Sequence, residues 1–225
     1  MTPGADLVLA IDATHEFGSL ALACGPEVLE EVLLHAPSGF GHVLFERLAR
    51  LFERHHLAPD DIACFAAASG PGSFTGVRVG LACVKGLAEA AGKPAVAVSN
   101  LQAMASLGSA PLRAAVLDAR RGEIYGAVYD DAGRMVSPEV VAKFPAWLEQ
   151  LPDRVQFVST DFTPFRAALA GTRFAGAEIV TAPRALAGAV ARIAAAAYQR
   201  GQASDPAALD ANSVRRSDAE LFWKE

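Results

Sequence analysis

The 225-residue sequence is poor in cysteine, carries no excess of basic residues and has no long apolar run. Its three cysteines, Cys24, Cys64 and Cys83, show no C-x-x-C spacing. Because disulfide frameworks and zinc sites use paired cysteines, the sequence predicts free thiols in a reducing compartment. The net charge of −5 argues against a dedicated nucleic-acid-binding protein, in which basic residues normally prevail.

Signals for export and for membrane insertion are also missing. No basic segment precedes an apolar one near the N-terminus, and every apolar run is far shorter than a membrane span. The sequence therefore predicts a soluble cytoplasmic protein. Hydrophobic residues make up 52% of the chain and can fill the core of one domain or of two small ones.

Local signatures of the common hydrolases are absent as well. Five histidines occur, and no two are four residues apart, the spacing at which one helix holds a metal ion with two imidazoles. His55 and His56 are adjacent, so on a helix their side chains point about 100° apart. No Gly-x-Ser-x-Gly nucleophile elbow appears either. We therefore expect no metal site and no catalytic residue in this chain.

The most informative segment is Ser69–Leu81, which reads Ser-Gly-Pro-Gly-Ser-Phe-Thr-Gly-Val-Arg-Val-Gly-Leu. It follows a short apolar strand, and Gly70 and Gly72 permit backbone angles closed to other residues. Ser73 or Thr75 can cap a helix that begins there. Such a turn can hold an anion, yet the P-loop lysine and the dinucleotide Gly-x-Gly-x-x-Gly are missing. The segment fits either an anion site or a tight turn that needs glycine in order to pack.

Patterns of apolar residues predict an α/β protein. In the first half the expected elements are strands at 7–11, 18–24 and 28–34, a helix at 42–55, a strand at 64–68, a helix beginning in the glycine-rich segment, and a strand at 95–98. On the first helix, Leu44, Leu48 and Leu51 fall on one face and charged residues on the other. Ser38 would have to serve as its N-terminal cap.

The second half repeats the opening of the first. A strand at 113–117 ends in Asp118, as the strand at 7–11 ends in Asp12, and in both places a polar turn and an alternating strand follow. We therefore expect a duplicated unit. Helical signals in this half are weaker and fall at 145–151, 163–170 and 185–200.

Three stretches of the sequence resemble the TsaB (YeaZ) family: Leu9–Thr14, Gly70–Leu87 and Leu117–Tyr125. Members of that family are bacterial partners of the enzyme that makes threonylcarbamoyladenosine in tRNA. The resemblance implies an α/β fold of the actin-like ATPase (ASKHA, ribonuclease H-like) class, with two similar β-rich α/β halves. We place the N-terminal half, which holds the partner-binding helices, at 1–108 and a reduced second half at 109–225.

The resemblance implies a non-catalytic scaffold and activator rather than an enzyme. Such a subunit dimerises with the TsaD-type transferase and helps to recruit a TsaE-type ATPase, and alone it forms a homodimer. The complex forms N6-threonylcarbamoyladenosine next to the anticodon in ANN-decoding tRNAs, and contact of this subunit with tRNA is at most indirect. Arg113, Arg120 and Arg121 form a small basic cluster, which we interpret as a solvated turn rather than an RNA contact.

The helix that begins near Ser73 has more apolar surface than one sheet contact needs. Its apolar residues span roughly 200°, whereas one core-facing stripe requires about 100°. A second contact is expected, either inside the domain, including the helix at 42–55, or with another chain. The resemblance implies that these two helices contact the partner, and the candidate residues are Leu44, Leu48, Leu51, Ser73, Phe74, Val77, Arg78, Leu81 and Lys85.

Asp12 and Asp118 are weak candidates for a nucleotide or metal site. In actin-like ATPases a strand-end aspartate handles the metal ion, and Mg²⁺ is typically bound through one or two carboxylates. The turn at 14–18 is poor in the glycines and hydroxyls that hold phosphates, so turn formation suits both aspartates better. We expect that this chain requires no cofactor, with a weak or vestigial ATP or ADP site left open and with ATP and metal on the partner subunits.

Two rival functions make different demands. An independent actin-like phosphotransferase or ATPase would need ATP binding by this chain, with Asp12 or Asp118 essential. A metallopeptidase would need a bound metal, which the histidine spacing does not supply. The segment 210–216 lacks the proline and tyrosine of the family's Pro-x-Tyr-hydrophobic-Arg tail, so the resemblance carries over no docking role for that tyrosine.

Overall fold

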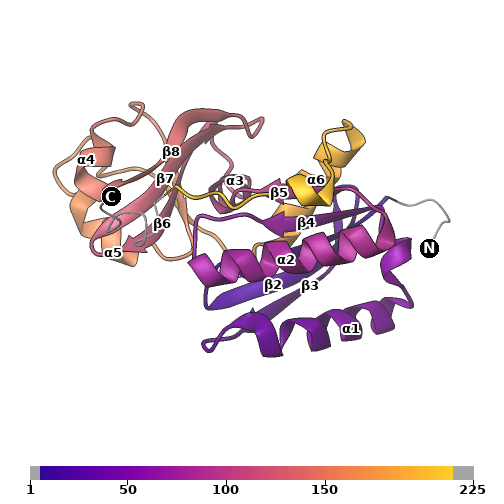
Figure 1. Ribbon diagram of the computed structural model, residues 1–225. Helices are drawn as coiled ribbons and strands as arrows, with labels where there is room; N and C mark the ends of the chain where they lie inside the picture. Colours follow the sequence, from indigo (N-terminus) through magenta and orange to yellow (C-terminus); the bar gives the residue numbers. More distant parts are fainter. Residues whose placement is uncertain (1–5, 215–225) are drawn as a thin grey trace, which may run out of the picture. The chain divides into compact units, whose positions relative to one another are not determined.

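The computed structural model describes residues 6–214 (Figure 1), so the basic pair Arg215 and Arg216 lies outside the described part of the chain. The described residues form two compact units, 6–100 with 184–212 and 101–183 with 213–214. This division differs from the expected one after residue 108, because the chain returns from the second unit and packs a helix on the first sheet.

The first unit is built on a five-stranded mixed sheet with the order β3-β2-β1-β4-β5. Its strands are β1 (Leu7–Asp12), β2 (Phe17–Cys24), β3 (Glu27–His35), β4 (Cys64–Ala68) and β5 (Ala95–Val98). The first three strands are antiparallel, and β4 and β5 run parallel to β1. Every residue of β1 and β4 is buried, as expected for nearly continuous apolar runs covered on both faces.

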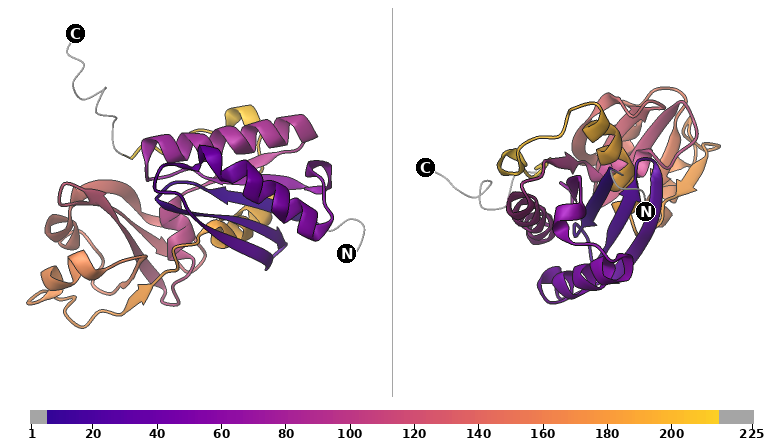
Figure 2. Two further views of the ribbon diagram at one scale, coloured as in Figure 1. Left: turned by 90° about the horizontal axis from the view of Figure 1, so that it is seen from below. Right: turned by 90° about the vertical axis from the view of Figure 1, so that its right-hand side faces the viewer.

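Two helices cover one face of this sheet and a third covers the other (Figure 2). They are α1 (Leu44–His55) and α2 (Phe74–Ala91) on one side and α6 (Ala187–Gln199) on the other. The N-terminus of α6 is capped from β2, because the Ser19 hydroxyl oxygen accepts hydrogen bonds from the amides of Leu186 (3.1 Å) and Ala187 (2.8 Å).

Of the two N-terminal caps that the sequence predicts, the structure confirms the one on α2 and contradicts the one on α1. Ser73 caps α2, its Oγ accepting a hydrogen bond of 3.3 Å from the Gly76 amide. Ser38 does not cap α1. A short 3₁₀ turn, Phe40–His42, leads into that helix, and Val43 stands at its N-cap without a side-chain hydrogen bond.

A C-terminal strap, residues 201–212, runs back along the first unit. Ser204 pairs with Ala95 and thereby closes the outer edge of β5. The 3₁₀ turn Pro206–Ala208 then lies against α2, where the Lys85 ammonium donates to the Ala207 carbonyl at 3.3 Å. Asn212 ends the strap by donating its amide to the Ser69 carbonyl at 2.8 Å.

The second unit repeats the sheet of the first. Its five strands have the order β10-β9-β6-β7-β8. The strands are β6 (Leu112–Arg120), β7 (Glu123–Asp130), β8 (Met135–Lys143), β9 (Gln156–Ser159) and β10 (Ile179–Thr181). Read from β8, the order and directions match those of β3-β2-β1-β4-β5, which confirms the expected duplication.

Helices in the second unit are short: α3 (Asn100–Ala105), α4 (Phe144–Leu148) and α5 (Thr163–Arg166). The core between this sheet and α4 and α5 is aromatic, with Phe144 in ring contact with Trp147, Phe157, Phe162 and Phe165. Across residues 6–214, no helix combines the length and the apolar character that crossing a membrane would require.

Candidate functional site

The turn after β1 uses the Asp12 carboxylate internally. Asp12 is buried, and its Oδ1 accepts hydrogen bonds from the amide (2.9 Å) and the hydroxyl (2.6 Å) of Thr14. Asn100 joins this turn to the glycine-rich segment, donating to the Thr14 hydroxyl at 2.7 Å and accepting from the Gly70 amide at 3.0 Å. The carboxylate therefore supports a turn, as its strand-end position suggested.

The glycine-rich segment packs directly on that turn. The Ser73 amide donates to the Thr14 carbonyl at 2.6 Å. A Cβ atom on Gly72 would lie 2.5 Å from the same oxygen, and one on Gly76 would lie 2.1 Å from the Ala13 carbonyl oxygen. Of the two interpretations left open by the sequence, these contacts favour a turn that needs glycine for close backbone packing.

Asp118 has the corresponding place in the second unit. Its Oδ1 accepts a hydrogen bond of 2.8 Å from the Arg120 amide, at a turn where Arg120 and Arg121 both have positive φ. Asp118 itself is exposed. Both candidate aspartates thus complete the turn that follows their own strand.

The thiols and imidazoles of the described residues form no metal cluster. Within residues 6–214, no three His, Cys, Asp or Glu side chains gather closely enough to hold an ion. All three cysteines are free, with Cys24 half-buried. Burial raises the pKa of Cys64 to about 12 and that of Cys83 to about 11, which keeps these two thiols protonated and unreactive at neutral pH.

The nine candidate partner-binding residues divide into core and surface. Five of them are buried in the core of the first unit: Leu44, Leu48, Leu51, Val77 and Leu81. Ser73, Phe74 and Arg78 are exposed and Lys85 is half-buried. The structure therefore corrects the role of the five aliphatic side chains, because they hold α1 and α2 on the sheet and are not available to a partner at the surface.

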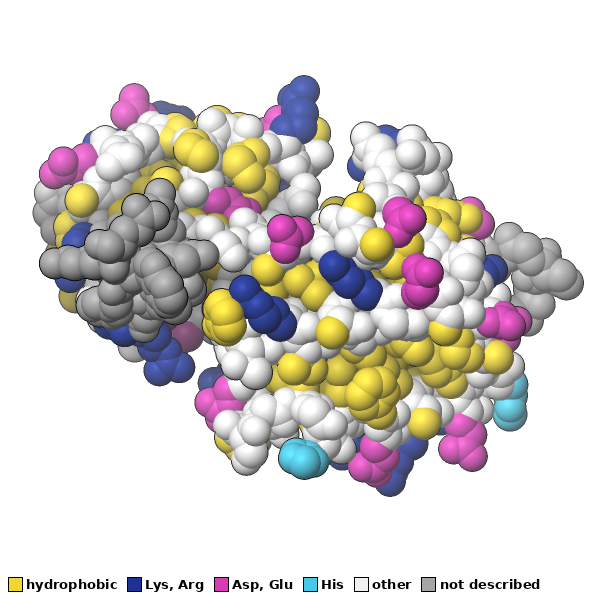
Figure 3. Space-filling view, viewed as in Figure 1, with side chains coloured by type: hydrophobic (Ala, Val, Ile, Leu, Met, Phe, Trp, Pro, Cys, Tyr) yellow, Lys and Arg dark blue, Asp and Glu magenta, His cyan; other side chains and the backbone are white. Residues whose placement is uncertain are grey.

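Both helices nevertheless expose apolar side chains. Phe45 on α1 and Phe74 on α2 are 62% and 58% exposed. We call the exposed and half-buried side chains of α1 and α2 the paired-helix surface, and its apolar and small members include Phe45, Ala49, Phe52, Phe74, Val79, Ala82, Gly86 and Leu87. Figure 3 shows hydrophobic side chains gathered in a band along these two helices. Large side chains exposed in this way on a folded unit often mark a protein–protein contact.

Phe74 is held in place although it is exposed. The guanidinium carbon of Arg78 lies 3.4 Å from the centroid of the Phe74 ring, within cation–π range. Arg78 Nη1 also donates to the Phe74 carbonyl at 3.3 Å. A fixed aromatic ring is a suitable anchor for a binding surface, because little side-chain entropy remains to be lost on association.

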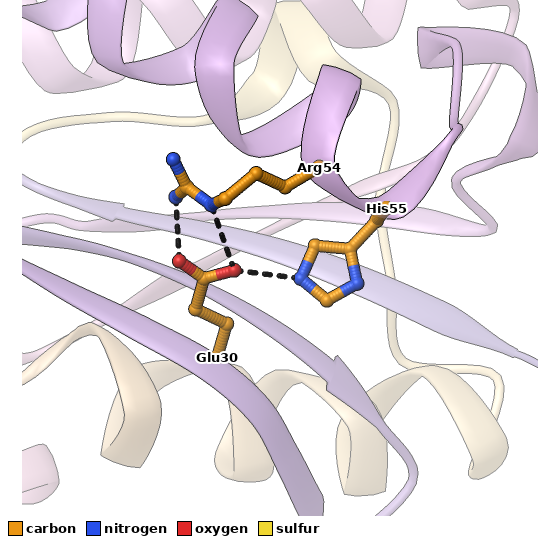
Figure 4. Close-up of polar contacts among 3 residues, drawn as sticks. All are labelled: Glu30, Arg54 and His55. Carbon is orange, nitrogen blue, oxygen red and sulfur yellow. Dashed lines mark hydrogen bonds and ion pairs between the residues drawn. The ribbon is translucent and has the colours of Figure 1, made fainter.

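The last turn of α1 is fastened to β3 by Glu30 (Figure 4). The Glu30 carboxylate accepts hydrogen bonds from Arg54 and, at 2.7 Å, from His55. The hydrogen bond from Arg54 is the main cause that holds the pKa of Glu30 below its ordinary value; burial opposes it by raising the pKa, and the hydrogen bond from His55 and the charges of both partners lower it further.

This lowered pKa predicts how stability depends on pH. A carboxylate with a depressed folded-state pKa stabilises the protein above the unfolded pKa, and that contribution is lost as the pH falls through the folded value. Wild type should therefore be more stable than Glu30→Gln at pH 7, and the difference should shrink below about pH 4.5. Urea unfolding of both proteins from pH 7 to pH 3 measures it, and a difference that stays constant down to pH 3 would contradict the ion pair.

Comparisons with known proteins agree with the fold described above. A family model described as "TsaD: tRNA N6-adenosine threonylcarbamoyltransferase" matches residues 41–212. The "tRNA threonylcarbamoyladenosine biosynthesis protein TsaB" of Bacillus subtilis (strain 168) is 30% identical over 152 residues, which cover 65% of this chain and 66% of that protein. The matched part thus spans slightly less than two thirds of the length of this curated relative.

Two solved structures resemble the fold. YeaZ from Pseudomonas aeruginosa superposes with a TM-score of 0.78 at 23% identity, over 92% of this chain and 98% of that one. The activator of the 2-hydroxyisocaproyl-CoA dehydratase from Clostridium difficile, with bound ADPNP, gives a TM-score of 0.50 at 12% identity, over 88% and 97% of the two chains.

The two mixed sheets share one strand order. They define a protein of the actin-like ATPase (ASKHA, ribonuclease H-like) fold class. With the matched model and relatives, the chain belongs to the TsaD family and, within it, to the TsaB (YeaZ) group.

Proposed function

We propose that this chain is a non-catalytic scaffold and activator subunit of the complex that forms N6-threonylcarbamoyladenosine in ANN-decoding tRNAs. It contacts a TsaD-type transferase through the paired-helix surface and forms a homodimer through the same surface when the transferase is absent. The observation that carries the proposal is the exposure of Phe45 and Phe74 on two adjacent helices of a well-packed unit.

The internal use of polar groups supports a role without chemistry of its own. Asp12, Thr14 and Asn100 satisfy one another and the glycine-rich segment, instead of pointing unpaired toward a substrate. We propose that the chain requires no cofactor in the cytoplasm, where it acts, and that ATP and metal belong to the TsaD-type and TsaE-type subunits. A structural relative holds ADPNP, so weak ATP or ADP binding remains part of the proposal.

Co-purification with the TsaD-type protein of the same cell tests this function. A stoichiometric complex is expected, together with tRNA modification that depends on addition of this chain. The chain alone should neither hydrolyse nor tightly bind ATP. Absence of a complex, combined with ATP turnover by the isolated chain that is lost in Asp12→Ala, would show that the protein is instead an actin-like ATPase.

A further inference from the structure

The contact between the last turn of α1 and β3 joins three charged or titratable side chains. Arg54 approaches Glu30 with two nitrogens, Nε at 3.3 Å from Oε2 and Nη2 against Oε1. His55 Nε2 lies 2.7 Å from Oε2. We call Glu30, Arg54 and His55 the clasp, and both oxygens of its carboxylate are used by donors from one helix turn (Figure 4).

On α1 the clasp has the last position of an apolar series. Leu44, Leu48 and Leu51 repeat at the spacing of one helix face and are buried against the sheet. The next position of that face is His55, whose side chain is only 22% exposed. A fourth apolar residue would continue the stripe, and the chain places an imidazole there instead.

On β3, too, a polar residue has a position in an apolar series. Alternate residues of a strand face one side, and on the side of α1 the strand presents Val32 and Leu34, both packed in the core of that side. Glu30 has the preceding position of this series. One polar residue therefore replaces an apolar one in each of two facing series, and the two replacements meet.

The hydrogen bonds of the clasp are also the polar contacts that join α1 to the rest of its unit. In the described part of the chain, no other side-chain hydrogen bond or ion pair links α1 to another element, since Arg50 pairs with Glu46 of the same helix. The remaining attachment is apolar packing, and the hydrophobic effect that drives it is non-directional.

Partly buried ion pairs add little net stability, because desolvation offsets most of the attraction, and hydrophobic replacements of similar size are often neutral or stabilising. Where such pairs are useful, they fix one arrangement among several of similar energy. The clasp has the geometry for this, because a two-nitrogen guanidinium contact and an imidazole contact on one carboxylate define both the rotation and the axial position of a helix end.

We propose that the clasp sets the position of α1 on the sheet and thereby gives the paired-helix surface the shape that its protein partner recognises. The inference rests on the proposed function, since it concerns the same surface. Glu30 and His55 are thus positioning residues: they lie on the sheet side of α1, whereas Phe45 is on its exposed side.

A double variant separates position from stability. Glu30→Val with His55→Leu restores both apolar series, and its melting temperature should equal or exceed that of wild type. Its affinity for the TsaD-type protein of the same cell, measured by titration calorimetry, should be at least tenfold weaker. A double variant that binds with wild-type affinity would overturn the inference, and so would one whose loss of binding is matched by loss of the folded state while Glu30→Gln still binds normally.

Glu16→Gln is the matched control. It removes a Glu–His contact of the same length, 2.7 Å to His35, which does not touch α1. This variant should bind like wild type, whereas Glu30→Gln should bind more weakly. If Glu16→Gln weakens binding equally, charge rather than position is responsible and the inference fails.

Failure of the proposed function can be told apart from failure of the clasp. If wild type does not bind the TsaD-type protein at all, the proposed function is wrong, and hydrogen exchange of the isolated chain then tests the clasp. Amides of the last turn of α1 should exchange at least several-fold faster in Glu30→Gln than in Glu16→Gln. Equal exchange in the two variants would mean that the clasp does not hold α1.

Discussion

Replacing Gly76 with alanine is expected to prevent the first unit from folding, although the same change in a helix normally stabilises a protein. Gly76 lies in the first turn of α2, where a Cβ atom would stand 2.1 Å from the Ala13 carbonyl oxygen. That oxygen belongs to the backbone of a buried turn, so relief requires α2 itself to move away from β1. We expect a loss of about 4 kcal/mol or more, or no soluble protein. Thermal unfolding measures the outcome.

Gly86→Ala is the matched control on the same helix. Apart from its chain neighbours and the backbone of its own helix, no atom lies within 4 Å of a Cβ at that position. Helix propensity alone then acts, and the change should stabilise the protein by about 1 kcal/mol. Opposite signs for the two glycines are the expected result. A folded Gly76→Ala protein with the melting temperature of wild type would show that the glycine-rich segment does not pack on the turn after β1.

Phe74→Asp is expected to abolish most of the affinity for the TsaD-type partner while leaving the subunit folded. Phe74 is 58% exposed, so removal of its ring leaves no cavity in the core. Among the described residues, the ring contact that is lost is the one with Arg78. An aspartate at the first position of α2 is favourable to the helix dipole. A buried charge at the centre of an interface should weaken binding by about 100-fold, roughly 2.7 kcal/mol.

Met135→Asp provides the comparison for that variant. Met135 is 52% exposed and belongs to the second unit, away from α1 and α2 in the chain. Calorimetric titration of both variants with the TsaD-type protein should show normal affinity for Met135→Asp and the loss for Phe74→Asp. Normal binding by a folded Phe74→Asp protein would remove Phe74 from the proposed contact.

The sequence predicted the strands of the first unit together with β6 and β7, and it missed β8, β9 and β10. β1, β2 and β4 are mainly apolar, and each was expected within two residues of its true ends. β8 contains Pro138 and alternates irregularly, and β10 has three residues, so neither pattern stands out from loop sequence.

Local pattern could not separate core from surface on α1 and α2. Periodicity identified the apolar face that includes Leu44, Leu48 and Leu51, but what covers such a face depends on residues distant in sequence. The bonds from Asn100 to Thr14 and from His55 to Glu30 join residues 86 and 25 positions apart, and no spacing rule indicates them. A single signal was available for the clasp: a polar residue at one end of each of two apolar series, His55 after Leu51 and Glu30 before Val32.

The path of the chain also bears on how it folds during synthesis. The first unit lacks α6 and the C-terminal strap until residues 184–212 have been made, and without them one face of its sheet and the outer edge of β5 are bare. Residues 101–183 form their own sheet earlier, as an insertion. We therefore expect the second sheet, which lies wholly within residues 101–183, to be complete before the first unit, whose last helix and strap are synthesised after it.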